Sequence, residues 1–202
     1  METPPYPCFL DVEASGFGDK SYPIEIAWSN EAGEIQRYLI NPASCADWVS
    51  WNADSEKIHG IDRPRLERNG WDPEFVATRL TEDLHGKTVY TDAPDFDDSW
   101  VAKLFTAVKQ PKPFHCEHID ELLLTVLRKP DDAIWQAMLH IERIKNELTE
   151  FRSGTHSAGY DVGYLLQLWR KAHGDAVKMN HGIGPLPLTT ATGTFMRLKS
   201  NK

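Results

Sequence analysis

A short apolar segment near the N-terminus places the strongest constraint on the fold. From Tyr6 to Glu13 the residues are nearly continuously apolar, and the segment ends in acidic residues at positions 11 and 13. Such a segment is typical of a central strand that is buried on both faces of a sheet. Sheets of this kind are covered by helices on both faces. The segment therefore predicts an α/β protein with this strand inside the sheet.

The remaining segments predict a mixed sheet of five strands flanked by helices. Residues 24–29 and 35–40 read as two strands joined by a turn at 31–34. After them strands and helices alternate, which is typical of parallel strands. The later predicted strands cover 88–91 and 114–119, and the predicted helices cover 51–59, 73–84, 98–108, 134–148 and 159–173. We therefore expect three antiparallel strands followed by parallel strands.

Length and composition predict one domain. A chain of 202 residues can bury a sizeable core, and no segment has the composition of a linker. We expect a single domain over residues 1–202, with a core from about 6 to 175 and a C-terminal tail over 176–202. We find no membrane-spanning run, no signal peptide and no CxxC pair among the three cysteines. These features predict a cytoplasmic protein with reduced thiols and no membrane partner.

The formal net charge of −8 narrows the kinds of nucleic acid that the chain could bind. It argues against a broad basic surface for long duplexes, because such binding depends on many contacts from Lys and Arg to phosphates. A nuclease that grips only one strand end needs few of these contacts. Bound divalent cations would also offset acidic residues locally.

Two acidic residues end the first predicted strand. Asp11 and Glu13 are two residues apart, so both carboxylates face the same side of the strand. They lie at its carboxyl end, where open α/β sheets place their ligands. Converging acids favour a hard divalent ion such as Mg²⁺ or Mn²⁺, which would offset their charge. Two solvated acids entering a turn would give the same pattern, so the pair alone leaves both interpretations open.

Two further segments carry candidate ligands. Asp97 falls at the start of a predicted helix, in a stretch over 91–100 that holds four acids. Acids at helix starts are also routine caps, so this stretch alone leaves the choice of residue open. Asp161 shares a helical face with Leu165, which is an unusual place for a charge. His156 precedes the same helix and by itself would be read as a surface histidine.

Together these segments resemble the DEDDh exonucleases, the DnaQ-like family of 3′→5′ exonucleases with a ribonuclease H-like fold. Residues 11–13, 96–97 and 156–161 are similar to the first, second and third motifs of that family. Residues 57–61 are similar to its IHGI segment, and the resemblance runs from about residue 9 to 169. It implies a ribonuclease H-like mixed five-stranded sheet.

The chain departs from the family pattern at a few positions. Ala14 stands where the first motif usually has Thr or Ser, and Asp92 lies near the place of a usual Asn. Neither change removes a metal ligand, but both leave the details of substrate contact open. A sister family has Tyr four residues before the last Asp. That position is Ser157 here, so the histidine form of the motif fits.

The resemblance implies catalysis with two divalent ions, Mg²⁺ or Mn²⁺. Asp11 would bridge both ions, and Asp97 would support one of them. Glu13 and Asp161 would hold the ion that carries the attacking water. His156 would be the general base, because an imidazole titrates near neutrality. The implied activity is hydrolysis of single-stranded DNA or RNA from the 3′ end, releasing nucleoside 5′-monophosphates.

The resemblance also implies a site for the terminal nucleotide. Backbone groups of Ala14 and Ser15 would lie near the 3′-hydroxyl, and flat apolar groups would stack on the last base whatever its identity. The implied substrate-binding residues are Ala14, Ser15, Gly16, Phe17, Ile58, His59 and Trp100. Core packing would equally explain Ile58 and Trp100.

Other interpretations stay open at this stage. The chain could be a nucleic-acid end-binding module without catalysis, or an unrelated metal-dependent hydrolase of small phosphoesters. The sequence does not distinguish DNA from RNA, and it leaves homodimer formation open. His115 and His118 could suggest zinc, but a strand would direct them to opposite sides.

Overall fold

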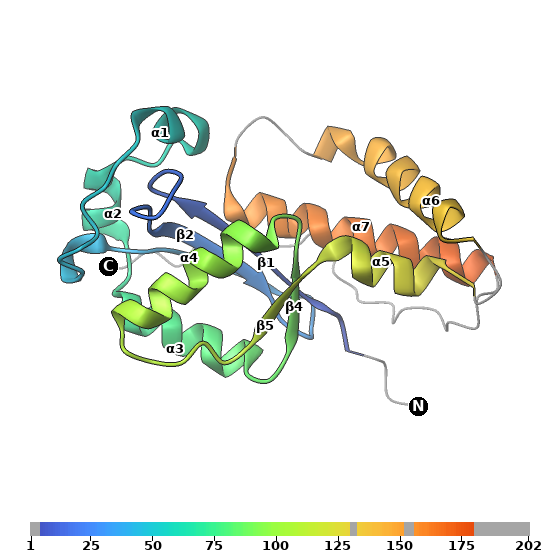
Figure 1. Ribbon diagram of the computed structural model, residues 1–202, viewed down its shortest axis with the longest axis horizontal. Helices are drawn as coiled ribbons and strands as arrows, with labels where there is room; N and C mark the ends of the chain where they lie inside the picture. Colours follow the sequence, from blue (N-terminus) through green and yellow to red (C-terminus); the bar gives the residue numbers. More distant parts are fainter. Residues whose placement is uncertain (1–4, 130–132, 152–155, 180–202) are drawn as a thin grey trace.

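The central predicted strand does lie inside a five-stranded sheet. The computed structural model describes residues 5–129, 133–151 and 156–179 (Figure 1). The sheet has the order β3-β2-β1-β4-β5. The strands are β1 (Cys8–Ala14), β2 (Pro23–Ser29), β3 (Ile35–Leu39), β4 (Thr88–Thr91) and β5 (His115–His118). β1, β2 and β3 pair antiparallel, whereas β4 pairs parallel with β1 and β5, which confirms the predicted topology.

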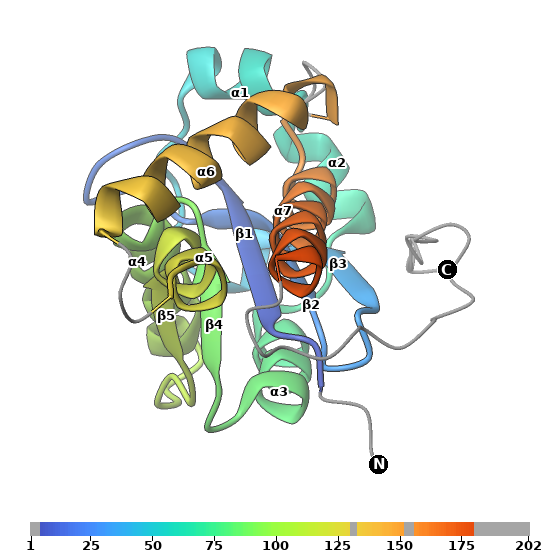
Figure 2. The same ribbon diagram turned by 90° about the vertical axis from the view of Figure 1, so that its right-hand side faces the viewer.

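Helices cover both faces of the sheet. The α-helices are α1 (Ala53–His59), α2 (Arg63–Asn69), α3 (Pro73–Leu84), α4 (Pro94–Ala107), α5 (Ile119–Leu127), α6 (Ile134–Glu147) and α7 (Ala158–Lys178). Leu10 and Val12 of β1 pack in one core with α3 and α4, whereas Phe9 packs in a second core with α5, α6 and α7. Figure 2 shows α5 and α7 side by side over the second face. β1 is therefore buried on both sides, as its composition predicts.

Two helices were missing from the prediction, and others differ at their ends. α5 was not predicted, although its buried residues Ile119, Leu123 and Leu127 recur at helical spacing. The residues of α2 were not assigned to any element. α4 begins at Pro94 rather than Asp98, so Asp97 lies within its first turn. α7 runs to Lys178, beyond the predicted end at 173. Residues 180–202 of the predicted tail lie outside the described residues.

Two findings concern the residues that the structure describes. The strand predicted over 114–119 is β5 at 115–118, and among the residues that the structure describes no group suited to a metal ion includes them. In the same ranges, no helix combines the length and the apolar character needed to span a membrane.

Candidate functional site

The carboxyl end of β1 forms the centre of the candidate site. Asp11 and Glu13 alternate with buried Val12 and Ala14, so the two acids share the face that α7 covers. β4 pairs with β1 only at Cys8 and Phe9, and β1 continues past this pairing. The end of β1 thus lies between the start of α7 on one side and the segment that links β4 to α4 on the other.

The first group of acids consists of Asp11, Asp92 and Asp97. One carboxylate oxygen from each lies within 4.8 Å of the others. Asp97 has only 2% of its surface exposed, and it accepts a hydrogen bond from the Thr91 hydroxyl. Its neighbours are excluded from the group, because Asp95 is exposed and Asp98 pairs with Lys112.

Asp92 was not predicted as a ligand. In the sequence, Asp92 stands out only as lying near the place of a usual Asn. It directly follows β4, which lies next to β1 in the sheet. The carboxyl ends of adjacent parallel strands meet at one edge, so this position was the signal that could have identified it.

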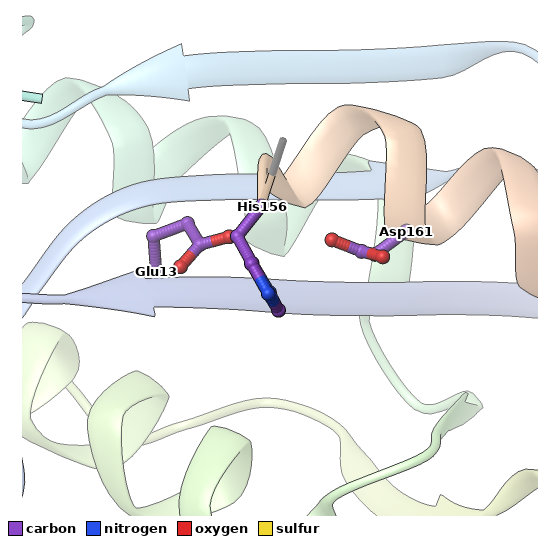
Figure 3. Close-up of side chains that lie close together, drawn as sticks. All are labelled: Glu13, His156 and Asp161. Atoms are coloured by element: carbon purple, nitrogen blue, oxygen red, sulfur yellow. The ribbon is translucent and has the colours of Figure 1, made fainter. Parts of the chain in front are cut away.

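The second group consists of Glu13, His156 and Asp161. One ligand atom from each lies within 4.8 Å of the others. Figure 3 shows the two carboxylates on either side of the His156 side chain, which extends from the start of α7 toward β1. His156 is exposed, whereas Glu13 and Asp161 are partly buried. The structure therefore brings together all five residues that the motifs single out, in two adjoining groups.

Burial and mutual repulsion raise the pKa values of three of these carboxyls. Burial, followed by the charges of Asp97 and Asp161, raises the pKa of Asp11 well above its usual range. Burial and then the charge of Glu25 raise the pKa of Glu13 to about 8. Burial raises the pKa of Asp97 to about 7, although the hydrogen bond from Thr91 opposes the shift. The charge of Asp161 acts on carboxyls of both groups, so the two groups form one electrostatic unit.

The donor set fits a hard divalent cation. Carboxylate oxygens with a single imidazole are the ligands of Mg²⁺ or Mn²⁺ rather than of a closed thiolate site. A cation among these acids would also remove the repulsion that raises their pKa values. Each group offers three ligand atoms within 4.8 Å of one another, so either group could hold a metal ion.

We expect the metal-free protein to lose thermal stability as the pH rises. The folded-state pKa values are about 8 for Glu13 and about 7 for Asp97, against ordinary values of 4.5 and 3.8. Folding therefore favours the protonated carboxyls. Their contribution to stability is complete when the pH is below the ordinary pKa values. It is lost as the pH rises through the folded-state pKa values. Mg²⁺ should reverse the loss, because it binds the ionised form.

Thermal unfolding with and without Mg²⁺ checks this expectation. The gain in Tm from Mg²⁺ should be larger at about pH 8 than at about pH 5, by about 2–4 °C for each kcal/mol recovered. Asp97→Asn should flatten the pH dependence, whereas Asp95→Asn on the same turn should leave it unchanged. An equal gain in Tm at both pH values would contradict the assignment.

A small cavity of about 60 Å³ opens beside Glu13. Its lining residues are Val12, Glu13, Ala14, Gly16, Phe17, Ser55, Ile58, His59 and Trp100. Phe17 is 70% exposed and Phe96 is 51% exposed, and their rings lie 6.1 Å apart. Both rings also contact the buried ring of Trp100. Six of the seven predicted substrate-binding residues line this cavity, and exposed aromatic rings stand at its edge.

Ser15 is the predicted substrate residue that does not line the cavity. Its N–H donates to the Tyr22 carbonyl, and its hydroxyl accepts from the Tyr22 N–H. Its carbonyl accepts from the Asn52 N–H. A Cβ at Gly16 would lie 2.9 Å from the Asn52 Cβ, so this close approach requires a residue without a side chain. Ser15 and Gly16 thus fix the turn that carries Phe17.

His59 presents an unsatisfied donor in this region. Its Nδ1 accepts from the Ile61 N–H at 3.1 Å, so in the neutral ring the proton is on Nε2. Burial lowers the pKa of His59, which favours that neutral ring. Nε2 is buried and has no hydrogen-bond partner within the described parts of the chain. A buried donor without a partner costs free energy, so a ligand acceptor would be favourable here.

Comparison with known proteins identifies the fold. No model of a protein family matches the sequence, and no curated protein matches it. E. coli exonuclease I in complex with a dA16 oligonucleotide matches in structure with a TM-score of 0.59 and 16% identity, over 85% of this chain. Exonuclease I from Methylocaldum szegediense matches with a TM-score of 0.55 and 18% identity, over 87% of this chain. The chain has the ribonuclease H-like fold, and it spans 42% of each of those two chains.

Proposed function

We propose that the chain is a metal-dependent 3′→5′ exonuclease that acts on single-stranded DNA or RNA. The observation that carries the proposal is the pair of ligand groups at the end of β1, beside a cavity with exposed aromatic rings. Two compact ligand groups support two ion positions, which Mg²⁺ or Mn²⁺ would occupy. The likeness in fold to exonuclease I solved with oligonucleotides adds support.

The acidic residues have distinct roles in this proposal. Asp11 would help to hold the ions, since it belongs to one ligand group and the charges of carboxylates in the other group also act on it. Glu13 and Asp161 would hold one ion. Asp97 would hold the other, with Asp92 beside it. When bound, the ions supply positive charge for the phosphate and the leaving 3′ oxygen and lower the pKa of water.

His156 would move the proton. Its ring lies between Glu13 and Asp161 and is exposed, so a ring nitrogen can accept the proton of the water that attacks phosphorus. The bond from phosphorus to the 3′ oxygen then breaks. A nucleoside 5′-monophosphate leaves, and the shortened strand keeps a new 3′-hydroxyl.

The terminal nucleotide would lie at the mouth of the cavity next to Glu13. Ala14, Gly16 and Ile58 would shape it, while Phe17 and Trp100 would contact the base. The Nε2–H of His59 would find an acceptor on the substrate. Because the net charge is −8, we expect the grip to be confined to a strand end rather than spread along a duplex.

One assay tests the proposed function. Single-stranded DNA, single-stranded RNA and duplexes, each labelled at the 5′ end, are incubated with Mg²⁺, Mn²⁺ or a chelator. Ladders that shorten from the 3′ end only with metal are the expected result. Binding of the strand end without cleavage would instead identify an end-binding module. Hydrolysis of a chromogenic monoester with intact oligonucleotides would identify a small-phosphoester hydrolase.

We expect Phe17→Ala to weaken substrate binding. Stacking on one base is worth about 1–3 kcal/mol, which corresponds to a rise of about 5- to 150-fold in KM. kcat should change little, because Phe17 does not belong to either ligand group. Steady-state kinetics on a single-stranded oligonucleotide measure both constants. Trp135→Ala is the matched control, since Trp135 is an exposed aromatic residue of α6 outside the cavity. Equal KM values for the Phe17→Ala variant and the wild type would exclude the contact.

A further inference from the structure

A second glutamate lies next to the ligand groups without belonging to them. Glu25 is on β2, and the register pairs it with Glu13 across the two strands. Paired residues of antiparallel strands point to the same face, so Glu25 also points toward α7. Its side chain is completely buried. Two acids opposed in this way repel each other, so the position of Glu25 requires a physical reason.

The contacts of Glu25 supply that reason. One carboxylate oxygen accepts from Arg37, with the Nε of Arg37 at 2.7 Å. The other oxygen accepts from the Ala158 N–H at 2.9 Å and from the Ser157 hydroxyl at 3.1 Å. Ser157 is the N-cap of α7, yet its side chain forms no capping hydrogen bond to the helix. Glu25 thus performs from β2 the capping that the helix lacks, and its charge suits the positive end of the helix.

The capped turn carries two of the ligand-group residues. His156 directly precedes Ser157, and the N–H of Asp161 donates to the Ser157 carbonyl at 3.1 Å. A shift at Ser157 would therefore move the imidazole and the carboxylate together relative to Glu13. A buried ion pair is weak evidence for stability, because apolar replacements are often neutral or stabilising. Positioning explains the buried Glu25 better than stability does.

We propose that Glu25, paired with Arg37, is a positioning residue that anchors the first turn of α7 and sets His156 and Asp161 against Glu13. The inference rests on the proposed function for its catalytic consequence. Glu25→Leu removes both hydrogen bonds to α7. Glu25→Gln keeps an oxygen that can accept from Ala158. Ser157→Ala leaves the ion pair with Arg37 intact and removes one bond.

Kinetics on a single-stranded oligonucleotide, measured well below Tm, separate positioning from stability. We expect Glu25→Leu to lower kcat about 10²-fold, because a small misplacement of reacting groups has an effect of this size. KM should change little, Glu25→Gln should restore most of the turnover, and Ser157→Ala should give a smaller loss than Glu25→Leu. Ser29→Ala is the matched control. Ser29 lies on β2, as Glu25 does, and its hydroxyl accepts a buried hydrogen bond from the Phe9 N–H. The substitution removes that hydrogen bond and should leave kcat unchanged.

A second measurement does not depend on activity. Exchange of the Ala158 amide hydrogen should accelerate in Glu25→Leu and not in Ser29→Ala, because only the first variant frees that amide. If Glu25→Leu does not fold, Ser157→Ala carries the kinetic comparison, because it removes one of the two bonds from α7 to Glu25. A wild-type protein that cleaves no nucleic acid would reject the proposed function, while amide exchange would still decide the role of Glu25. Wild-type kcat and wild-type Ala158 exchange in Glu25→Leu, or wild-type kcat in Ser157→Ala where Glu25→Leu does not fold, would overturn the positioning role.

Discussion

Asp11→Asn is expected to reduce strand cleavage by about 10³-fold or more, since metal ions contribute several kcal/mol and each 1.36 kcal/mol is a factor of ten. Asp11 interacts with the carboxylates of Asp97, Asp161 and Glu13, so it acts on both groups. Asn keeps the shape of the side chain but removes the charge that attracts a cation. Release of mononucleotides from a 5′-labelled oligonucleotide measures the effect, and calorimetry with Mn²⁺ measures metal affinity.

The fold of this variant should stay intact. The raised pKa of Asp11 reflects burial and repulsion among acids, and Asn removes that repulsion. The metal-free variant should therefore unfold at a temperature equal to or above that of the wild type. Asp161→Asn should behave in the same way. Asp95→Asn changes an exposed acid on α4 and should keep wild-type activity. Normal activity in folded Asp11→Asn or Asp161→Asn would reject the metal assignment.

His156→Ala is expected to slow the chemical step by about 10²–10⁴-fold, which is the usual contribution of a general base. Binding of the strand should change little, because the imidazole lies beside Glu13 and Asp161 rather than in the cavity. Single-turnover kinetics separate the chemical step from binding.

Two comparisons make the His156 test specific. His115→Ala removes an exposed histidine at the N-terminal end of β5, whereas the site lies at the carboxyl ends of the parallel strands. This substitution should leave the chemical step unchanged. The pH dependence of the rate should lose one ionisation in His156→Ala but not in His115→Ala. If the pH–rate profile is the same with and without His156, the imidazole is not the base.

The residues of the site could be predicted because the motif residues lie within short segments of the sequence. The two-residue interval between Asp11 and Glu13 places both acids on one face of any strand. The interval between His156 and Asp161 places both near the start of a helix. The choice among Asp95, Asp97 and Asp98 could not be made from the residues alone. The choice depends on which of these three acids points toward β1 in the folded chain. Asp97 does so and lies next to Asp11 and Asp92.

Other parts of the site required contacts between distant segments. Asp92 joins Asp97 only because β4 lies beside β1. Glu25 resembles any acid in a strand until its 2.9 Å hydrogen bond to Ala158, 133 residues away, is seen. α5 was missed although Ile119, Leu123 and Leu127 recur every four residues, and the predicted strand over 114–119 included its first residue.

The sequence by itself determined the central strand, the order of antiparallel and parallel strands, and the motif residues at the ends of β1 and α7. Local periodicity, turn residues and motif spacing suffice for these, because each depends on neighbouring positions. Only the tertiary structure decided that the acids form two groups, that Asp92 belongs to one of them and that Glu25 secures α7. These features arise where the sheet brings β1, β2 and β4 together with α7, and no local pattern encodes such distances.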